Sequence, residues 1–496
     1  MPAAGRAPAR RGGSPPALPW RAVVLSAALA SGVAAVAMPV VAAHAGGFLL
    51  RGDGVAYFLY ARALVLEGST DPTAGYRQLD ARLASDPTGP LEALRESAHA
   101  VPGTGRVALP WPVGAGVLMA PFYALGWGAE RVVAAEAGRA PDSFGTIPQA
   151  GYGLGAVVYG LLGFWASFLA AARVADAGAA AVAAMALVFA GPAVFYVFLH
   201  PTMAHAPSFG LAALLVLLWW RLWDAGEAGI GALAALAALL GLLVLVRYQN
   251  IVFGVLPAAL WARLAGRRQW RTAGAAAAAA LVALLAYAAP LGVEVAHLAS
   301  TGELRWARPA AATGLPGAPA RDPAGAGAGA GSVLVAQNRF DFTSPHLLDV
   351  LVSCQHGAFY WTPVLGLGAA ALAFQALRHG WARAFGAVLL ASVYLAGCLV
   401  GRTNWSGDNA FGMRYLTECV PLLAPALAAW IGLAAAPAAR WAWTLGLALL
   451  VAGNGLLMLA FARGTISHNL CVTYPQMAAG IVRALPGATA ETAHAR

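Results

Sequence analysis

An acidic residue, Asp53, stands between two glycines in RGDGVAYFLYARALVLEG (51–68), directly after the first long apolar run of the chain. A carboxylate can orient a hydroxyl group and accept its proton, which is general base catalysis. Apolar residues at helical spacing follow, so Asp53 could instead be the N-cap of an amphipathic helix over 55–67. The residue type leaves both hypotheses open, a base and a helix cap.

Arg247 lies between two short apolar runs in LLVLVRYQNIVFGVL (242–256). A charge at the centre of a membrane helix costs about 2.5–3.5 kcal/mol on insertion scales, and less near the interface. The planar guanidinium binds phosphate with two parallel hydrogen bonds, so Arg247 is a candidate phosphate ligand. Gln249 and Asn250 would then orient the phosphate or a sugar. The alternative is an arginine that extends to lipid headgroups.

Further polar candidates stand next to apolar runs. They are His200 and His205 in HPTMAHAPSF (200–209), His356 in QHGAFYWTP (355–363), and Asp408 and Arg414 in NWSGDNAFGMRY (404–415). Each could instead be an ordinary interfacial or loop residue. Arg414 could also form an i, i+4 ion pair with Glu418 on one helix.

Metal binding is not indicated by these residues. His200 and His205 are five positions apart, with two prolines nearby, so they do not share a helical face. The four cysteines lack CxxC spacing, which indicates neither zinc nor a disulfide scaffold. Whether Cys354, Cys419 or Cys471 form a disulfide is left open.

The composition indicates that these candidate residues belong to a membrane protein. The chain has 496 residues, of which 60% are hydrophobic and 10% charged. A soluble domain carries about 25% charged residues, which excludes an ordinary cytosolic enzyme. The net charge of +10 comes from 31 arginines and no lysine. These arginines are scattered between apolar runs, so nucleic acid is not an expected partner.

Eleven apolar runs predict transmembrane helices, since about 20 residues at 1.5 Å each cross the hydrocarbon core. They are 22–43, 150–172, 177–199, 206–220, 228–246, 248–262, 272–293, 357–377, 384–401, 419–439 and 441–462. The first is interpreted as an uncleaved anchor rather than a signal peptide. The fold class is therefore an all-α polytopic membrane protein.

A twelfth run, 107–129, is rich in proline and glycine and decides the topology. If it stays on the outer face as an interfacial or re-entrant segment, the cytoplasmic segments hold 13 arginines against three acids, and the outer side 18 of each. The positive-inside rule favours this arrangement, with the N-terminus cytoplasmic and the C-terminus outside.

This topology gives the domain organisation. Residues 1–21 form a cytoplasmic tail, 22–462 the transmembrane domain, and 463–496 an extracytoplasmic tail. The long outer segments are 46–148 and 294–356, and the shorter one is 402–418. Within 294–356, the low-complexity stretch 310–331 is expected to be disordered.

The pieces Asp53, the helix 55–67, LPWPVGAGVLMAPFYALG (109–126), HPTMAHAPSF, VRYQN (246–250), QHGAFYWTP and NWSGDNAFGMRY together resemble the GT-C class of membrane glycosyltransferases. The resemblance covers most of the chain from 45 to 440. The pieces look like those of bacterial GT-C-like membrane proteins, some of which are mannosyltransferase-like. The resemblance implies a large first outer loop, a lipid-linked sugar donor and Asp53 in catalysis. Many members carry two adjacent acids there, whereas Gly54 follows Asp53, so a divalent metal is not indicated.

The sequence therefore predicts a glycosyltransferase in the bacterial plasma membrane, with its active face extracytoplasmic. A polyprenyl-phosphate sugar is the expected donor, and a lipid, glycan or protein the acceptor. Asp53 is the expected base, and Arg247, Gln249, His200, His205, His356, Asp408 and Arg414 the expected substrate-binding residues around one outer cavity. The alternatives are a non-enzymatic lipid or polysaccharide transporter, which should bury charges at mid-membrane, and an inactive GT-C homologue.

Overall fold

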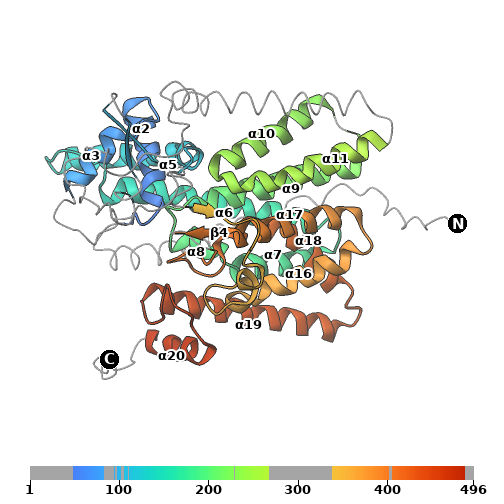
Figure 1. The fold of residues 1–496 in the computed structure, drawn as a ribbon. Coiled ribbons are helices and arrows are strands. Elements are labelled where there is room, and N and C mark those ends of the chain that lie inside the picture. Colours follow the sequence, from blue (N-terminus) through green and yellow to red (C-terminus); the bar gives the residue numbers. More distant parts are fainter. Residues whose placement is uncertain are drawn as a thin grey trace.

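The computed structural model describes residues 49–82, 94, 98–101, 105–109, 111–227, 229–266, 338–401 and 405–485. The predicted spans 22–43 and 272–293 and the stretch 310–331 lie outside these residues. The described chain is almost entirely helical (Figure 1). Two short antiparallel strand pairs, β1 with β2 and β3 with β4, are the exceptions in this part of the chain. The prediction of an all-α fold is confirmed.

The elements follow one another in chain order. They are α2 (Gly54–Glu67), α3 (Thr73–Arg82), β1 (His99–Val101), β2 (Arg106–Ala108), α5 (Gly114–Glu136), α6 (Thr146–Ala171), α7 (Ala177–Phe189), α8 (Ala193–Phe198), α9 (His205–Ala225), α10 (Ile230–Val246), the 3₁₀ helix η1 (Tyr248–Gly254), α11 (Val255–Gly266), β3 (Asn338–Phe340), α14 (Leu347–Val352), α15 (Ala358–Trp361), α16 (Pro363–Ala376), α17 (Gly380–Gly397), β4 (Leu399–Gly401), the 3₁₀ helix η4 (Arg414–Cys419), α18 (Val420–Gly432), α19 (Pro437–Ala462) and α20 (Tyr474–Ala484).

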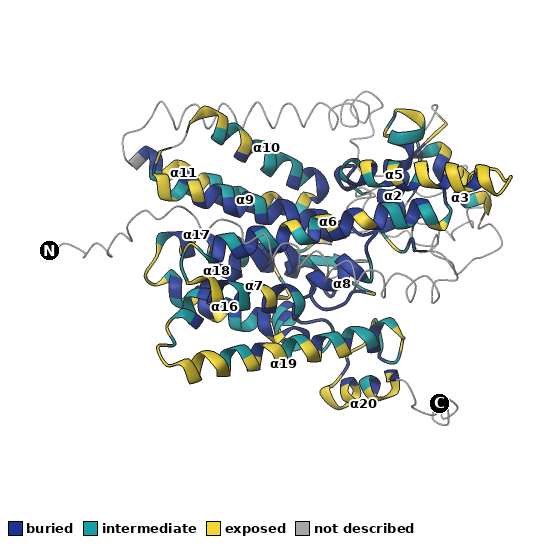
Figure 2. Cartoon of the chain, turned by 180° about the vertical axis from the view of Figure 1, so that it is seen from behind, coloured by how far each residue is buried: buried dark blue, intermediate teal, exposed yellow. Residues whose placement is uncertain are grey.

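Five described helices are long and apolar enough to cross a membrane: α6, α9, α17, η4 continued by α18, and α19. Three shorter apolar helices, α7, α10 and α16, accompany them. In Figure 2, α6, α9 and α18 are mostly buried in the centre of the bundle, whereas α19 lies at its edge. Trp441 and Leu449 on α19 are 73% and 65% exposed, which suits a helix that faces lipid. The chain is a multi-pass membrane protein, and the count of eleven crossings stays a prediction.

Three of the predicted spans are broken by short helices. Span 177–199 divides into α7 and α8 around Pro192, and span 357–377 into α15 and α16 before Pro363, because proline lacks the N–H that a continuous helix requires. Span 248–262 begins as the 3₁₀ helix η1. The short helices at these breaks lie next to predicted site residues: α8 ends before His200, α15 begins after His356, and η1 begins after Arg247.

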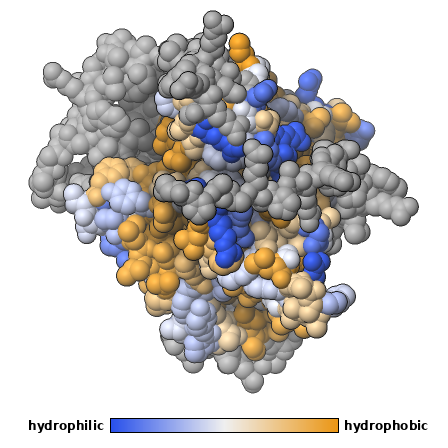
Figure 3. All heavy atoms as spheres, turned by 90° about the vertical axis from the view of Figure 1, so that its right-hand side faces the viewer, coloured by the Kyte–Doolittle hydropathy of each residue, from blue (hydrophilic) through white to orange (hydrophobic). Residues whose placement is uncertain are grey.

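One end of the bundle carries the charged ends of four helices. Arg173 after α6 pairs with Asp224 near the end of α9 at 3.0 Å. Arg440 at the start of α19 pairs with Asp176 before α7 at 3.2 Å. Figure 3 shows hydrophilic side chains scattered among apolar ones at the end of the molecule opposite α2 and α3. All four charged residues belong to segments that the arginine distribution assigns to the cytoplasm.

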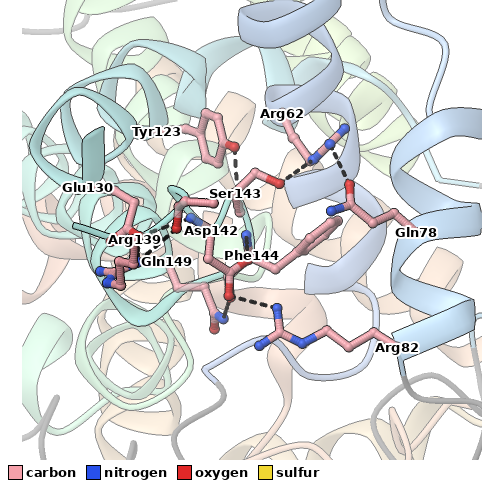
Figure 4. A network of polar contacts seen from close by, with 11 residues as sticks. Arg62, Gln78, Arg82, Tyr123, Glu130, Arg139, Asp142, Ser143, Phe144 and Gln149 are labelled. Atoms are coloured by element: carbon pink, nitrogen blue, oxygen red, sulfur yellow. Dashed lines mark hydrogen bonds and ion pairs between the residues drawn. The ribbon is translucent and has the colours of Figure 1, made fainter. Parts of the chain in front are cut away.

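The lobe at the other end contains α2, α3 and α5 (Figure 1). Arg62 on α2 donates from Nε to Ser143 Oγ (3.1 Å) and from Nη2 to Gln78 Oε1 (2.7 Å). Glu130 on α5 accepts from Arg139 Nη1 (2.6 Å) and from the backbone N–H of Asp142 (3.0 Å). Figure 4 shows these contacts as one network. The network fixes α2, and hence its first residues, on the rest of the lobe.

Two details of this lobe differ from the sequence analysis. The helix expected over 55–67 is present. The prediction that it is amphipathic is wrong, since all residues from Gly54 to Ala63 are buried, whichever side of α2 they lie on. The apolar run 107–129 forms most of α5, a continuous helix of 23 residues that includes Pro121. Its placement at the interface stays a prediction. Gly116 permits close packing of α5 on α2, because a Cβ there would lie 2.7 Å from the Tyr57 carbonyl oxygen.

Candidate functional site

Arg247 lies where α10 ends and the backbone becomes extended (φ −152°, ψ 117°) before η1. Its side chain is 8% exposed, and its Nη1 donates to Glu418 Oε1 at 3.0 Å. The same Nη1 lies against the His205 ring, 3.2 Å from Nε2. With its amide oriented to accept, Gln249 takes hydrogen bonds from Nε (3.1 Å) and Nη2. Both edges of the guanidinium are thus engaged within the protein.

Glu418 is the site residue that the sequence analysis missed. It is 2% exposed, and His205 Nδ1 lies 3.7 Å from its Oε1. The alternative use of Arg414, an i, i+4 ion pair with Glu418, is wrong. Both belong to the 3₁₀ helix η4, where three residues per turn place i and i+4 about 120° apart rather than on one face. An acid at the start of an apolar span (TECVPLLAPALAAW) was the signal that could have identified it.

Asp53 faces Arg414 rather than its own helix. It is the N-cap residue of α2, but its side chain makes no capping hydrogen bond. Its Oδ2 lies 3.6 Å from Arg414 Nη1, and the side chain is 27% exposed. Gly54 fixes this end of α2 against the turn before α9, because a Cβ there would lie 2.3 Å from Thr202 Oγ1. The geometry favours a role for Asp53 other than capping.

Tyr415 connects the two charged pairs. Its ring lies 5.3 Å from Arg414 Cζ and 6.0 Å from Arg247 Cζ. Cations within about 6 Å of an aromatic ring are attracted by its quadrupole. The structure thus brings together Asp53, His205, Arg247, Gln249 and Arg414 from distant parts of the chain, with Glu418 added.

The remaining predicted residues surround this cluster. His200 lies in the turn between α8 and α9, with its ring 5.9 Å from that of Phe195, and burial lowers its pKa to about 3. His356 is fully buried with a left-handed φ of 68°, and its Nδ1 donates to the Ser406 carbonyl oxygen at 2.9 Å. Burial lowers the pKa of His356 to about 4. Both histidines are therefore neutral at physiological pH.

His356 holds the loop that leads to Arg414. Asp408 lies in this loop with φ 52°, directly after Gly407 with φ 78°. A Cβ on Gly407 would lie 3.1 Å from Arg414 Nε, so glycine is required both by the backbone and by the guanidinium. That Nε is buried and has no hydrogen-bond partner within the described part of the chain. Arg414 therefore has a donor to spare, unlike Arg247.

A pocket that is partly open to solvent lies beside the cluster. Its polar wall is Gln249, Asn250, Tyr415 and Glu418. Ser392 and Cys419 also line it. The rest of the wall is apolar and comes from η1, β3, α17 and β4: Val252, Phe253, Phe340, Leu395, Ala396 and Leu399. No group of three His, Cys, Asp or Glu side chains suited to a metal ion occurs among the described residues. The chemistry on offer is that of carboxylates and arginines.

The cluster and the ion pair Arg173–Asp224 lie at opposite ends of α9. His205 is its first residue, and Asp224 precedes its last. A helix of 21 residues is about 30 Å long, which matches the hydrocarbon thickness of a bilayer. The site is thus one membrane thickness away from the pairs made by Arg173 and Arg440.

A disulfide joins Cys354 to Cys471, with Cα atoms 4.8 Å apart. It ties the segment before His356 to the segment after α19. The sequence separation of 117 residues gave no motif, so the expectation that no disulfide framework is indicated missed this bridge. Cys419, the third cysteine left open, is buried and free.

No family model matches the sequence, and no curated protein matches it. Among solved structures, the chain is similar to ArnT from Cupriavidus metallidurans bound to undecaprenyl phosphate. The identity is 14% and the TM-score 0.49, over 94% of this chain and 75% of ArnT.

It is also similar to the oligosaccharyltransferase AglB from Archaeoglobus fulgidus in complex with an inhibitory peptide and a dolichol-phosphate. The identity is 12% and the TM-score 0.40, over 90% of this chain and 56% of AglB. The Archaeoglobus fulgidus oligosaccharyltransferase in the apo form gives 12% and 0.39, over 92% and 54%. The chain spans just over half the length of these two archaeal proteins.

Proposed function

We propose that this protein is an integral-membrane glycosyltransferase that transfers a sugar from a polyprenyl-phosphate donor to an extracytoplasmic acceptor. One observation carries the proposal: a partly exposed carboxylate, Asp53, faces a buried arginine, Arg414, at one end of the membrane helices. A base next to a phosphate-binding cation is what this reaction needs.

The proposed reaction assigns one task to each group. The acceptor oxygen attacks the anomeric carbon, the bond from that carbon to the phosphate oxygen breaks, and the polyprenyl phosphate departs with the bonding electrons. Asp53 takes the proton of the acceptor hydroxyl. An arginine stabilises the departing phosphate through charge-assisted hydrogen bonds.

Two arginines are candidates for the phosphate. Arg247 was the expected ligand from the sequence, and its position beside Arg414 keeps it in the proposal. Arg414 is better placed to bind first, because its Nε has no partner among the described residues, whereas Arg247 already serves Glu418, Gln249 and His205. Asp53 and Glu418 balance the two arginines, so the site is neutral before a phosphodiester enters.

The disulfide supports an extracytoplasmic active face. Disulfides persist in oxidising compartments and are rare in the cytosol. Cys354 and Cys471 both belong to segments that the arginine distribution assigns to the outer side. Two independent arguments, charge distribution and cysteine chemistry, therefore favour the same orientation.

The alternative function is that of a transporter. The buried pair Arg247–Glu418 is an observation in its favour, since charged residues inside the membrane often mark transport pathways. Both residues lie at helix ends rather than midpoints, at the end of α10 and in η4 before α18. This position favours an interfacial enzyme.

The test uses the full-length protein in lipid nanodiscs, with a panel of undecaprenyl-phosphate sugars and membrane-extract acceptors. Released undecaprenyl phosphate is measured by mass spectrometry. We expect Asp53→Asn to reduce turnover by roughly 10²–10⁴, with donor binding retained. Asp349→Asn, an exposed acid paired with His346, is the matched control and should transfer normally. Near-normal transfer by Asp53→Asn would leave the carboxylate without a catalytic role.

A further inference from the structure

Glu418 has one carboxylate oxygen that the protein does not use. Oε1 accepts from Arg247 Nη1, but Oε2 has no hydrogen-bond partner in the part of the chain that the structure describes. The residue is 2% exposed, and an unpaired charged oxygen in such a place costs several kcal/mol unless something satisfies it. The geometry calls for a ligand that donates a hydrogen bond.

The place for that ligand is the partly open pocket whose polar wall includes Glu418. Gln249 and Asn250 stand on the same wall, and Phe253 and Leu399 are among the apolar residues of the rest. Asn250 is already engaged, since its Nδ2 donates to Ser208 Oγ and to the Leu243 carbonyl oxygen. Glu418 is therefore the strongest acceptor that the pocket offers.

The charge balance decides which donor fits. Arg247 neutralises Glu418 at 3.0 Å, so a bound ammonium would add an uncompensated positive charge beside the guanidinium. A phosphate would meet a carboxylate oxygen and be repelled. A neutral hydroxyl group satisfies Oε2 and leaves the charges balanced.

We infer that Glu418 is a specificity-determining residue that accepts a hydrogen bond from one hydroxyl group of the transferred sugar, which occupies this pocket. The inference rests on the proposed function and adds to it the position and chemistry of the sugar. The phosphate is bound on the Arg414 side of Tyr415, and the sugar hydroxyl on the Glu418 side.

A binding experiment tests this inference on the full chain in nanodiscs. The probes are undecaprenyl phosphate, undecaprenyl-phosphate pyranoses, and versions of the tightest binder in which one hydroxyl at a time is replaced by hydrogen. We expect one deoxy version to bind the wild-type protein roughly 10- to 100-fold more weakly, the usual worth of a hydrogen bond to a buried charge. This measurement needs no variant.

The variant Glu418→Gln then identifies the acceptor. The amide can still accept from Arg247 through its oxygen, but it turns an N–H₂ group toward the pocket. We expect the penalty for that deoxy sugar, taken within each variant as the ratio of its affinity to that of the parent sugar, to disappear. A change in phosphate binding that is common to both lipids cancels in this ratio. Glu130→Gln, another buried acid paired with an arginine but remote from the pocket, controls for the loss of such a carboxylate. It should keep the full penalty.

Four results would overturn the inference. A penalty that persists in Glu418→Gln would assign the hydroxyl to another residue. No hydroxyl is recognised if the wild type binds every deoxy version equally well. The same holds if it binds undecaprenyl phosphate and its sugar-bearing forms equally well. In both cases the lipid-phosphate part of the proposed function would stand. Binding of none of these lipids would end the inference and the proposed function together.

Discussion

The buried pair Arg247–Glu418 should be strongly coupled in stability. The two side chains are 8% and 2% exposed, and Nη1 and Oε1 lie 3.0 Å apart. Removing one partner of a buried pair leaves an uncompensated charge, which costs about 3–5 kcal/mol. We therefore expect Arg247→Gln and Glu418→Gln each to destabilise the protein by about this amount.

The double variant Arg247→Gln/Glu418→Gln leaves no lone charge. It should be more stable than either single variant, which requires a coupling free energy larger than either single cost, that is, more than about 3 kcal/mol. The measurement is reversible unfolding in mixed micelles titrated with SDS, followed by tryptophan fluorescence. The pair Arg173–Asp224 is the control, since it has the same 3.0 Å separation but side chains 27% and 49% exposed. Exposed pairs contribute about 0–1 kcal/mol, so its cycle should show little coupling. Equal coupling in both cycles would refute the reasoning from burial.

Four further outcomes are expected. Arg414→Lys should weaken donor binding more than Arg247→Lys, because lysine lacks the planar guanidinium and because Arg414 Nε has no partner among the described residues. Isothermal titration calorimetry with undecaprenyl phosphate measures the two affinities. A larger loss in Arg247→Lys would make Arg247 the main phosphate ligand. Gly54→Ala should lower turnover, since its Cβ would displace Thr202, and Thr202→Gly in the same protein should restore part of it; no rescue would mean that this contact does not position Asp53. His356 has a pKa of about 4 in the folded protein against its usual 6.5, so its contribution to stability is lost as pH falls from about 6.5 toward 4, by up to about 3 kcal/mol. His356→Asn, which tolerates a positive φ and can still donate to Ser406, should flatten this acid dependence of the unfolding midpoint, and an unchanged slope would contradict the assignment. Cysteine labelling in the 263–271 loop should occur only from the cytoplasmic side, and labelling from outside would invert the topology.

The sequence alone determined the class of the molecule and most of its helices. Apolar runs about as long as a bilayer is thick can satisfy their backbone polar groups only as helices, so α6, α9, α17 and α19 follow from composition. Residue chemistry also marked Asp53, His205, Arg247 and Arg414 as candidates, because each is a polar residue beside an apolar run.

Only the tertiary structure decided how these residues pair. The sequence left open an ion pair of Arg414 with Glu418, four positions apart, whereas the 3₁₀ geometry of η4 turns them to different sides. Glu418 then meets Arg247, 171 positions away, and Arg414 meets Asp53. Pairing across such sequence separations depends on how the helices pack. The residue pattern within one segment therefore cannot predict which distant residue a side chain will pair with.

The same limit applies to the helix α2 and to the disulfide. A helical spacing of apolar residues indicated that 55–67 is a helix, but its burial on every side depends on contacts with α5 and with the turn at Thr202. Cys354 and Cys471 lie in segments separated by α15, α16, α17, η4 with α18, and α19. The sequence determined which residues have the chemistry. The packing of the bundle determined which of them share a site, because distances between helices are set by side chains that lie far apart in the chain.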